Sequence, residues 1–165
     1  MNQRLADEVL EVVDGRDTVI GLARRGDIHA QGLLHRAVHV LVFDQAGRLY
    51  LQRRSANKDT HPGKWTSSAS GHVDPGESYE QAARRELAEE LGLESALEPL
   101  GRLAACALTE GEFTAVYRAT ADQEPRPDPH EISEGRFFGL TEAMALAAGP
   151  MATPSLGLVL GLLPA

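Results

Sequence analysis

The sequence is poor in the features that mark exported or membrane-spanning proteins. Cys106 is its only cysteine, so the chain can form neither an internal disulfide nor a cysteine-based zinc site, which suits a reducing compartment. The longest apolar run, residues 156–164, is far shorter than the roughly 18 residues that a membrane span needs. Acidic residues interrupt the N-terminal segment where a signal peptide would be apolar throughout. We therefore expect a cytoplasmic protein that does not enter a membrane.

Basic residues are also scarce. The chain has 16 lysines and arginines against 24 aspartates and glutamates, and its formal net charge is −8. Duplex nucleic acid and anionic membranes attract basic surfaces, so this balance argues against either as a main partner. The acidic excess instead favours sites that bind cations.

The length and composition indicate a single folded domain. The 165 residues are 42% hydrophobic and 24% charged, close to globular averages. We expect residues 1–33 to form an N-terminal β-hairpin extension and residues 34–165 to form the main domain. The expected strands are residues 9–13, 18–23, 37–43, 48–52, 65–70, 100–108, 113–119 and 135–140. Short helices are expected near the C-terminus. Strands on both sides of one strong helix predict an α/β fold, a mixed sheet covered by helices.

The strongest helix prediction covers residues 79–91. Ser78 and Gln81 have the spacing of a capping box, and Gly92 supplies the stop. Within this helix Glu86, Glu89 and Glu90 stand at i, i+3 and i+4, within about 100° of one face. We therefore expect the three carboxylates to converge and to bind a hard divalent ion such as Mg²⁺ or Mn²⁺. The alternative interpretation is a solvated acidic helix face.

The sequence around this helix favours the metal site over the solvated acidic face. Residues 71–93, GHVDPGESYEQAARRELAEELGL, resemble the signature of the Nudix family at every fixed position. Those positions are Gly71, Glu77, Arg85, Glu86, Leu87, Glu89, Glu90, Gly92 and Leu93. The resemblance implies the Nudix fold, an α/β/α sandwich with a mixed β-sheet, for residues 34–165. It also implies metal-dependent hydrolysis of a nucleoside diphosphate linked to another group.

The same resemblance assigns roles to individual residues. It implies that Glu86 and Glu90 are direct metal ligands and that Glu89 is a ligand or orients the attacking water. The backbone carbonyl of Ser70 would be a further ligand, and Glu77 with Arg85 would form a supporting pair.

Hydrolysis of a phosphoanhydride also needs a base and groups that bind phosphate. The base is either a glutamate of the signature or an acidic residue from a later loop. Glu110 and Glu112 are the first external candidates and Glu131 is the second, unless all three are ordinary solvated carboxylates. The basic loop before the signature offers Arg53, Arg54, Lys58 and Lys64 for a polyphosphate. Alternation along a strand puts Arg53 and Arg54 on opposite faces, so we expect only one of these two arginines to serve.

Residues 34–140 resemble one branch of the family in more detail, the type I isopentenyl diphosphate isomerases. The shared residues include His35-Arg36, Pro62-Gly63, Trp65-Thr66 and Gly71-His72. Those isomerases protonate an alkene with a cysteine immediately before the Gly-His pair, where this chain has Ser70. They also lack the complete glutamate helix. Both departures favour hydrolysis and indicate an isomerase-like subgroup of Nudix hydrolases.

One feature of the isomerases is partly present. Their metal site uses histidines and two loop carboxylates, and His35, His72, Glu110 and Glu112 occupy matching positions, with His29 near a third histidine. A second metal site is therefore one expectation, and histidines held in structural hydrogen bonds are the other.

Three functions remain open on this evidence. The first is a metal-dependent Nudix pyrophosphohydrolase acting on a small-molecule diphosphate. The alternatives are an isomerase-like enzyme and a non-catalytic nucleotide-binding domain. The N-terminal hairpin could pair across a homodimer.

Overall fold

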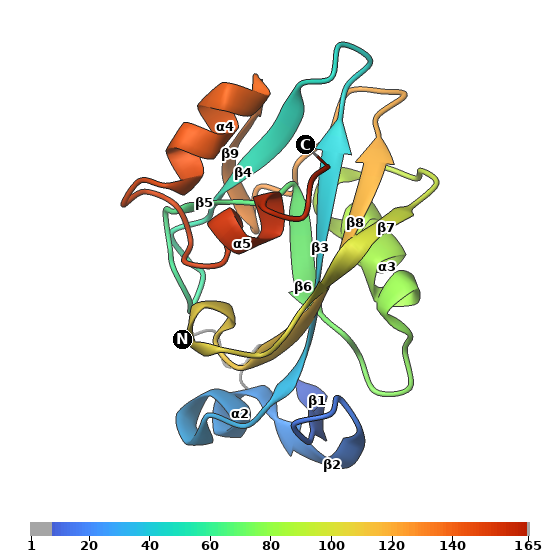
Figure 1. Ribbon diagram of the computed structural model, residues 1–165, viewed down its shortest axis with the longest axis vertical. Helices are drawn as coiled ribbons and strands as arrows, with labels where there is room; N and C mark the ends of the chain where they lie inside the picture. The colour runs from blue at the N-terminus through green and yellow to red at the C-terminus, as the bar shows by residue number, and fades with distance from the viewer. Residues whose placement is uncertain (1–7, 165) are drawn as a thin grey trace.

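One mixed β-sheet organises the computed structural model, which describes residues 8–164 (Figure 1). Its strands are β3 (His35–Phe43), β4 (Leu49–Arg54), β5 (Trp65–Thr66), β6 (Ala69–His72), β7 (Glu98–Leu103), β8 (Glu112–Thr120) and β9 (Ile132–Phe138). The order is β5-β4-β3-β8-β7, and β6 pairs with β3 while β9 pairs with β4. β3 runs parallel to β8 and antiparallel to β4 and β6. The sheet is mixed, as the sequence predicts.

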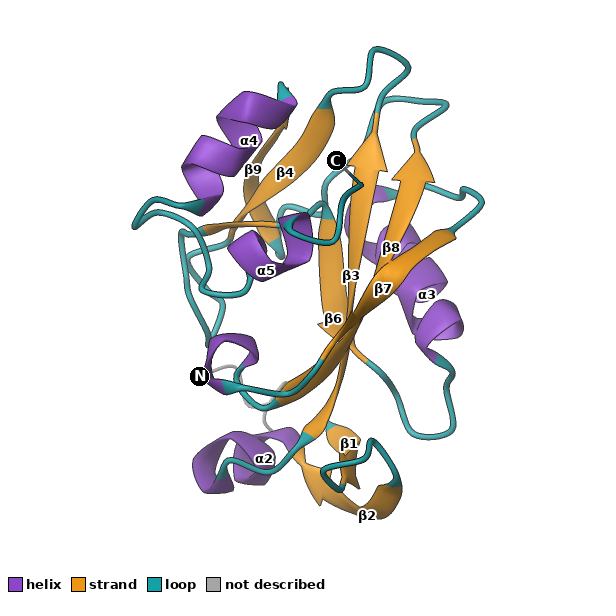
Figure 2. Ribbon diagram, viewed as in Figure 1, coloured by secondary structure: helices purple, strands orange, loops and turns teal. Residues whose placement is uncertain are grey.

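Helices cover both faces of this sheet (Figure 2). They are α3 (Tyr79–Leu91) on one face, and α4 (Leu140–Ala147) and α5 (Leu156–Leu160) on the other. Successive side chains of a strand point to opposite faces, and a strand covered on both faces is apolar throughout. Strand β3 follows this pattern. Val38, Val40 and Val42 pack with α3, whereas Leu41 and Phe43 pack with α4 and α5. The expected α/β/α sandwich is confirmed. Among the described residues, no helix is long and apolar enough to span a membrane.

Helix α3 begins and ends where the sequence predicts. The hydroxyl of Ser78 accepts a bond from the Gln81 N–H (3.2 Å), and the Gln81 side chain accepts one from the Ser78 N–H (2.8 Å). Gly92 ends the helix with φ 61°, in the left-handed region that glycine adopts without a steric penalty. Both ends are fixed by local chemistry, which explains why they can be predicted.

The N-terminal segment forms the expected hairpin and an unexpected helix. Strands β1 (Val9–Val13) and β2 (Val19–Arg24) make a separate two-stranded sheet. Helix α2 (Arg25–Gln31) follows directly. It was not predicted, because it has only seven residues, contains Gly26 and lacks a side-chain cap. Its Ile28 is fully buried against the hairpin.

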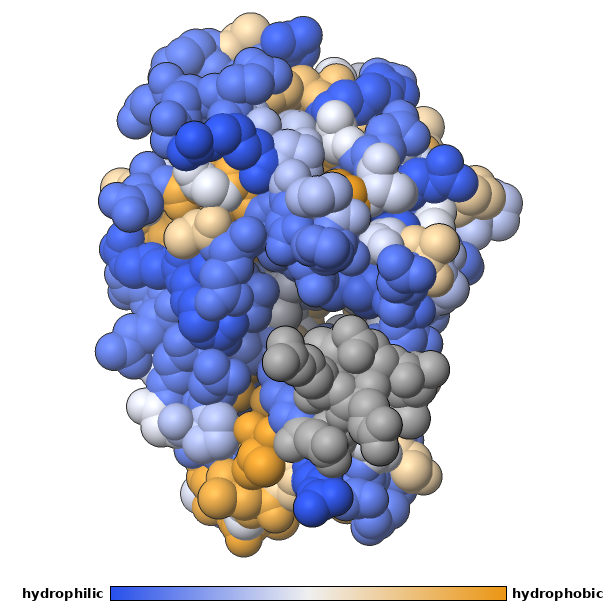
Figure 3. Space-filling view, turned by 180° about the vertical axis from the view of Figure 1, so that it is seen from behind, coloured by the Kyte–Doolittle hydropathy of each residue, from blue (hydrophilic) through white to orange (hydrophobic). Residues whose placement is uncertain are grey.

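The outer strand of the hairpin leaves apolar side chains in contact with solvent. In β2, Ile20 is 65% exposed and Leu22 is 63% exposed. The space-filling view shows apolar surface at this end of the molecule (Figure 3). Ion pairs from Arg36 to Asp17 (2.6 Å) and to Glu11 (3.2 Å) connect the hairpin to the main sheet.

Several predicted strand boundaries were wrong. The run 65–70 is divided into two strands, β5 and β6, with different partners. Strand β7 ends at Leu103, because Thr109 bonds back to Cys106 and closes a 3₁₀ turn, η1 (Ala107–Thr109). Strand β8 begins at Glu112, which pairs in register with His35 of β3. Glu112 therefore lies in the sheet and not in the turn where the sequence placed it.

Candidate functional site

Two glutamates of α3 point towards β6. Glu90 is 4% exposed, and its Oε2 accepts hydrogen bonds from the Gln52 side chain (2.6 Å) and from the Ser70 N–H (3.1 Å). The carboxylate of Glu86 lies against Gly71, where any Cβ would overlap it. The first residue of the signature is thus glycine because the backbone of β6 and the helix carboxylate must approach closely.

Burial makes these two carboxylates costly unless a cation accompanies them. It raises the pKa of Glu86 to about 8, and the neighbouring charge of Glu90 adds to the shift while Arg85 opposes it. Burial also raises the pKa of Glu90, and Lys58 opposes that shift. Because both groups are oxygen donors and burial disfavours their ionised form, the pair fits a hard divalent cation.

The supporting pair expected from the sequence forms in the structure. The Arg85 guanidinium donates to Glu77 at 3.0 and 2.9 Å, to Glu86 at 2.6 Å and to the His72 carbonyl at 2.9 Å. Burial raises the pKa of Glu77, but Arg85 outweighs it and the net shift is downward. Arg85 thus links the loop before α3, the helix and the end of β6.

The third helix glutamate does not join the other two. The Glu89 side chain is 61% exposed, and its one described contact is with Arg85 at 3.5 Å. All three glutamates line one cavity, but only Glu86 and Glu90 are shielded from solvent, because 100° of helix arc is wide enough to leave Glu89 on the solvent side.

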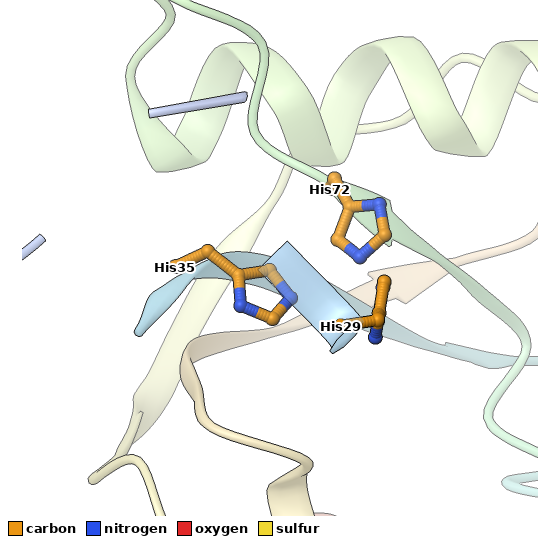
Figure 4. Close-up of side chains that lie close together, drawn as sticks. All are labelled: His29, His35 and His72. Atoms are coloured by element: carbon orange, nitrogen blue, oxygen red, sulfur yellow. The ribbon is translucent and has the colours of Figure 1, made fainter. Parts of the chain in front are cut away.

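A cluster of histidines lies beside the glutamate pair. His29 of α2, His35 of β3 and His72 of β6 turn towards one another (Figure 4), and one ring nitrogen from each lies within 4.8 Å of the others. Glu112 adds a carboxylate, 3.6 Å from His35 Nε2 and 3.4 Å from His72 Nε2.

Sheet register assembles this cluster. His35 and Glu112 are direct partners across the parallel strands β3 and β8. His72 ends β6 opposite Ala37, two residues beyond His35 on the same side of the strand. His29 comes from α2, the helix that the sequence did not predict.

The electrostatics of the cluster suit metal ligands. His35 Nδ1 lies 3.0 Å from the Leu33 carbonyl, which can only accept, so Nδ1 carries the proton and Nε2 is the free ligand atom. His35 Nε2 and His29 Nε2 are buried without a hydrogen-bond partner among the described residues. Burial, His72 and His35 lower the pKa of His29. Neutral imidazoles with one carboxylate are a common donor set for transition metals.

His72 and Glu112 stabilise each other's charged forms. Burial lowers the pKa of His72, but its contacts with Glu112 and Glu8 outweigh burial and raise the pKa to about 9. Burial raises the pKa of Glu112, but His35 and His72 outweigh it and the net shift is strongly downward. Without a metal the two form a buried ion pair.

Glu110 lies apart from this cluster. Its carboxylate contacts His61 Nε2 at 3.0 Å, and both residues adopt positive φ, 55° and 46°. The resemblance to the isomerases groups Glu110 with His35 and His72 as metal ligands. In the structure Glu110 instead faces His61, a residue that the sequence analysis did not identify.

Two cavities open beside these groups, of about 90 and 430 Å³. Glu112, Glu110 and two of the clustered histidines line the smaller cavity; Glu86, Glu89, Glu90 and Glu131 line the larger one. Four residues line both: Arg25, Lys58, Ser70 and His72. The two sites therefore share a wall.

Only part of the basic loop reaches the cavities. Lys58 lines both and pairs with Glu131, and Arg54 lines the smaller one. Arg53 faces away and contacts Glu134 at 3.8 Å, so one of the adjacent arginines reaches the site, as alternation predicts. Lys64 lines neither cavity.

Arg25 is a cation that sequence reasoning missed. It is 8% exposed, pairs with Glu8 (3.2 Å) and Asp59 (3.0 Å), and lines both cavities. It sits at the start of α2, and the pattern Arg25-Gly26-Asp27 carries no sequence signal for that helix.

Known proteins resemble this chain over most of its length. The family model described as NUDIX domain matches residues 33–156. An isopentenyl-diphosphate Delta-isomerase of Photorhabdus laumondii is 39% identical over 85% of this chain and 82% of its own length. An uncharacterized Nudix hydrolase of Pseudomonas aeruginosa is 37% identical over 93% and 94%.

The solved structures include a similar fold. The crystal structure of DR0079 from Deinococcus radiodurans has a TM-score of 0.83 and 32% identity, and it covers 93% of this chain and 98% of its own. Its sequence and its fold both resemble those of this chain.

Proposed function

This chain belongs to the Nudix family, and we propose that it is a pyrophosphohydrolase that requires Mg²⁺ or Mn²⁺ and cleaves a phosphoanhydride in a nucleoside diphosphate derivative. The main support is the pair Glu86 and Glu90 on one wall of the larger cavity, of which Glu86 is partly buried and Glu90 is buried. Two carboxylates with raised pKa values, beside a glycine that gives them room, are better explained by a divalent cation site than by a solvated helix face.

Glu86 and Glu90 would hold the ion together with the Ser70 carbonyl. When bound there, a divalent ion neutralises charge on the phosphate oxygens and orders water near phosphorus. Glu77 and Arg85 are positioning residues, because Arg85 fixes the Glu86 carboxylate (2.6 Å) while Glu77 fixes Arg85.

The cations at the shared wall would bind the phosphate chain. Arg25 and Lys58 border both cavities and Arg54 borders the smaller one. Arginine recognises phosphate through paired N–H groups, and lysine acts as a point charge. Arg53 and Lys64 are dropped from this role because neither lines a cavity.

For the general base we propose Glu89. It lines the larger cavity and its side chain is 61% exposed, so it can accept a proton from water. Its contact with Arg85 is long, at 3.5 Å, whereas the other candidates have closer or additional partners: Glu112 contacts two histidines, Glu110 contacts His61, and Glu131 pairs with Lys58.

The histidine cluster would hold a second metal ion. The unpartnered His29 Nε2 and His35 Nε2, with His72 and Glu112, supply the donors. The cavity that they border touches the shared wall.

Separation of the phosphorus-containing products by chromatography tests the proposed activity. The purified protein is assayed with nucleoside di- and triphosphates, nucleotide sugars and dinucleotides, with Mg²⁺, with Mn²⁺ and with a chelator. We expect metal-dependent hydrolysis of at least one class. If no compound is cleaved with either metal, the proposal fails.

An isomerase is the second candidate, because relatives 39% and 42% identical carry that name and because the histidine cluster resembles the isomerase metal set. Ser70 opposes it, since a serine hydroxyl is a poor proton donor in the place of a thiol. Cys106 cannot take over, because it is exposed and lines neither cavity. Deuterium exchange at the alkene carbons of isopentenyl diphosphate in D₂O distinguishes the two candidates. We expect no exchange, even for Ser70→Cys. Exchange at an enzyme-like rate would establish the isomerase.

A further inference from the structure

The smaller cavity is polar on nearly every side. The residues that line it include Thr60, Thr66, Ser70, Thr153 and Ser155, the cations named above, histidines that include His39, and the acidic residues Glu110 and Glu112. Its volume is about 90 Å³. Three water molecules fill about that space at roughly 30 Å³ each, whereas sites for whole organic ligands have roughly 300–1,000 Å³. The space has room for a phosphoryl group, and the adjoining cavity of about 430 Å³ has room for the rest of a larger ligand.

The C-terminal segment builds one wall of this cavity. The Trp65 N–H donates to the Met151 carbonyl (2.8 Å) and the Thr153 N–H donates to the Trp65 carbonyl (2.8 Å). This pairing sets Thr153 beside Thr66, and both are nearly fully buried. The Thr153 and Thr66 hydroxyls form a hydrogen bond at 3.3 Å. Either hydroxyl can donate in this contact, so one of the two protons is used between the threonines and the other can be donated to a ligand in the cavity that both residues line.

A second donor at the cavity lacks a partner. Arg25 is 8% exposed, and its Nε is buried without a hydrogen-bond partner among the described residues. An unpaired N–H of a buried cation is costly. A ligand that brings acceptor oxygens and negative charge, but no apolar surface, would satisfy it.

We propose that the smaller cavity seats an unsubstituted terminal phosphoryl group, with Thr66 as a specificity-determining donor. The inference rests on the proposed hydrolase function. It implies that the protein prefers diphosphates with one free end over diphosphates that carry organic groups at both ends. In the preferred reaction water adds to one phosphorus and the bridging P–O bond breaks. A nucleoside diphosphate then yields inorganic phosphate, the monophosphate and one proton.

Binding of a matched pair of compounds tests this preference without turnover. The methylene-bridged analogues of ADP and of ADP-ribose share the adenosine and both phosphorus atoms, and only the second is substituted at its far end. With Mg²⁺ present, we expect calorimetry to show the ADP analogue binding at least about tenfold more tightly. Equal affinities, tighter binding of the ADP-ribose analogue, or no binding of either would overturn the inference.

Variants at Thr66 sharpen the test. We expect Thr66→Val to weaken the ADP analogue about fivefold or more and to leave the ADP-ribose analogue unchanged, while Thr66→Ser keeps the wild-type ratio. Thr141→Val, at an exposed threonine of α4, is the matched control and should change neither affinity. If Thr66→Val does not fold by its melting curve, Ser155→Ala, at a partly exposed position of the same wall, replaces it. Unchanged affinities in the folded variants would contradict the proposed role of the hydroxyl groups that line the smaller cavity.

The two proposals fail in different ways. If no compound is hydrolysed but the binding preference is present, the hydrolase function is wrong and the assignment of the smaller cavity to a terminal phosphoryl group stands. If the protein cleaves ADP-ribose as efficiently as ADP, the hydrolase function stands, but the proposed preference for a free terminal phosphoryl group is wrong.

Discussion

The glutamate pair of α3 and the histidine cluster lie on either side of a shared wall, yet the chain builds them in different ways. Glu86 and Glu90 are one turn apart on a single helix. His29, His35, His72 and Glu112 come from four segments that meet through sheet register and the docking of α2. The first site depends on local structure and the second on tertiary structure.

The two sites also differ in how their charges are compensated. The glutamate pair has raised pKa values although Arg85 contacts Glu86 at 2.6 Å, so a further cation would favour its ionised form. The histidine cluster already contains an internal ion pair between His72 and Glu112. We infer that the glutamate pair depends more strongly on metal for its ionised form, and that the chemistry takes place there.

The largest expected effect comes from neutralising one member of the glutamate pair. Glu90→Gln should lower kcat at least about 10²-fold, because removing one ligand charge weakens transition-state stabilisation. The fold should survive, since the amide can still bond to the Ser70 N–H or to Gln52. Steady-state kinetics at saturating Mg²⁺, with circular dichroism as the check on folding, measures both. Comparable turnover in mutant and wild type would remove the glutamate pair from the reaction.

The second effect separates the two sites by their metals. His35→Ala should weaken Mn²⁺ binding at the histidine cluster by about tenfold or more, because it removes a first-row metal ligand. Glu90→Gln should leave that binding step in place. Titration followed by electron paramagnetic resonance counts the bound ions. His130→Ala, on an exposed loop, is the control. If the protein shows one metal-binding step and both variants lose it equally, the two groups of ligands form one site and not two.

A smaller effect concerns the supporting pair. Glu77→Ala and Arg85→Ala should each lower kcat/KM, and the double variant should lose less than the product of the two single losses, because the residues act as one unit. A double-mutant cycle gives the coupling directly. Arg84→Ala, whose partner is the exposed Glu80 (2.7 Å), should have little effect. Fully multiplicative losses would show that Glu77 and Arg85 act independently.

The smallest effect is expected at Ser70. Only its backbone is assigned to the site, through the N–H to Glu90 and the proposed carbonyl ligand. Ser70→Ala should therefore keep at least about half of the wild-type kcat, since the side chain supplies nothing that the reaction needs. A tenfold loss measured under the same conditions would show that the hydroxyl itself takes part.

The difference between the sites explains what the sequence could predict. A capping box, a glycine stop and a fixed spacing specify α3 and bring Glu86 and Glu90 together, because helix geometry is local. The same reasoning places Glu89 at the cavity but does not predict its exposure to solvent, since only packing decides which side of a 100° arc is buried. His35 and His72 could be proposed from resemblance, but their contact with Glu112 depends on parallel pairing of β3 with β8.

The contribution of α2 was the least predictable. The resemblance to the isomerases suggested His29, but nothing suggested Arg25. Both residues reach the site because Ile28 docks on the hairpin, a tertiary contact without a local sequence pattern. The hairpin itself was predicted from its turn, whose Asp14 side chain accepts from the Arg16 and Thr18 N–H groups. Turn chemistry is local, whereas the position of the following helix is not.

Hydrolysis in ¹⁸O-labelled water tests the central claim most directly. The protein is incubated with ADP and Mg²⁺, and the phosphorus-containing products are analysed by mass spectrometry. Attack of water on phosphorus predicts one ¹⁸O atom in the inorganic phosphate or in the monophosphate, and no label in wild-type reactions that contain a chelator or in reactions of Glu90→Gln over the same interval. Label that is absent from both products, or incorporated equally by Glu90→Gln, would contradict a hydrolase that works through the glutamate pair of α3.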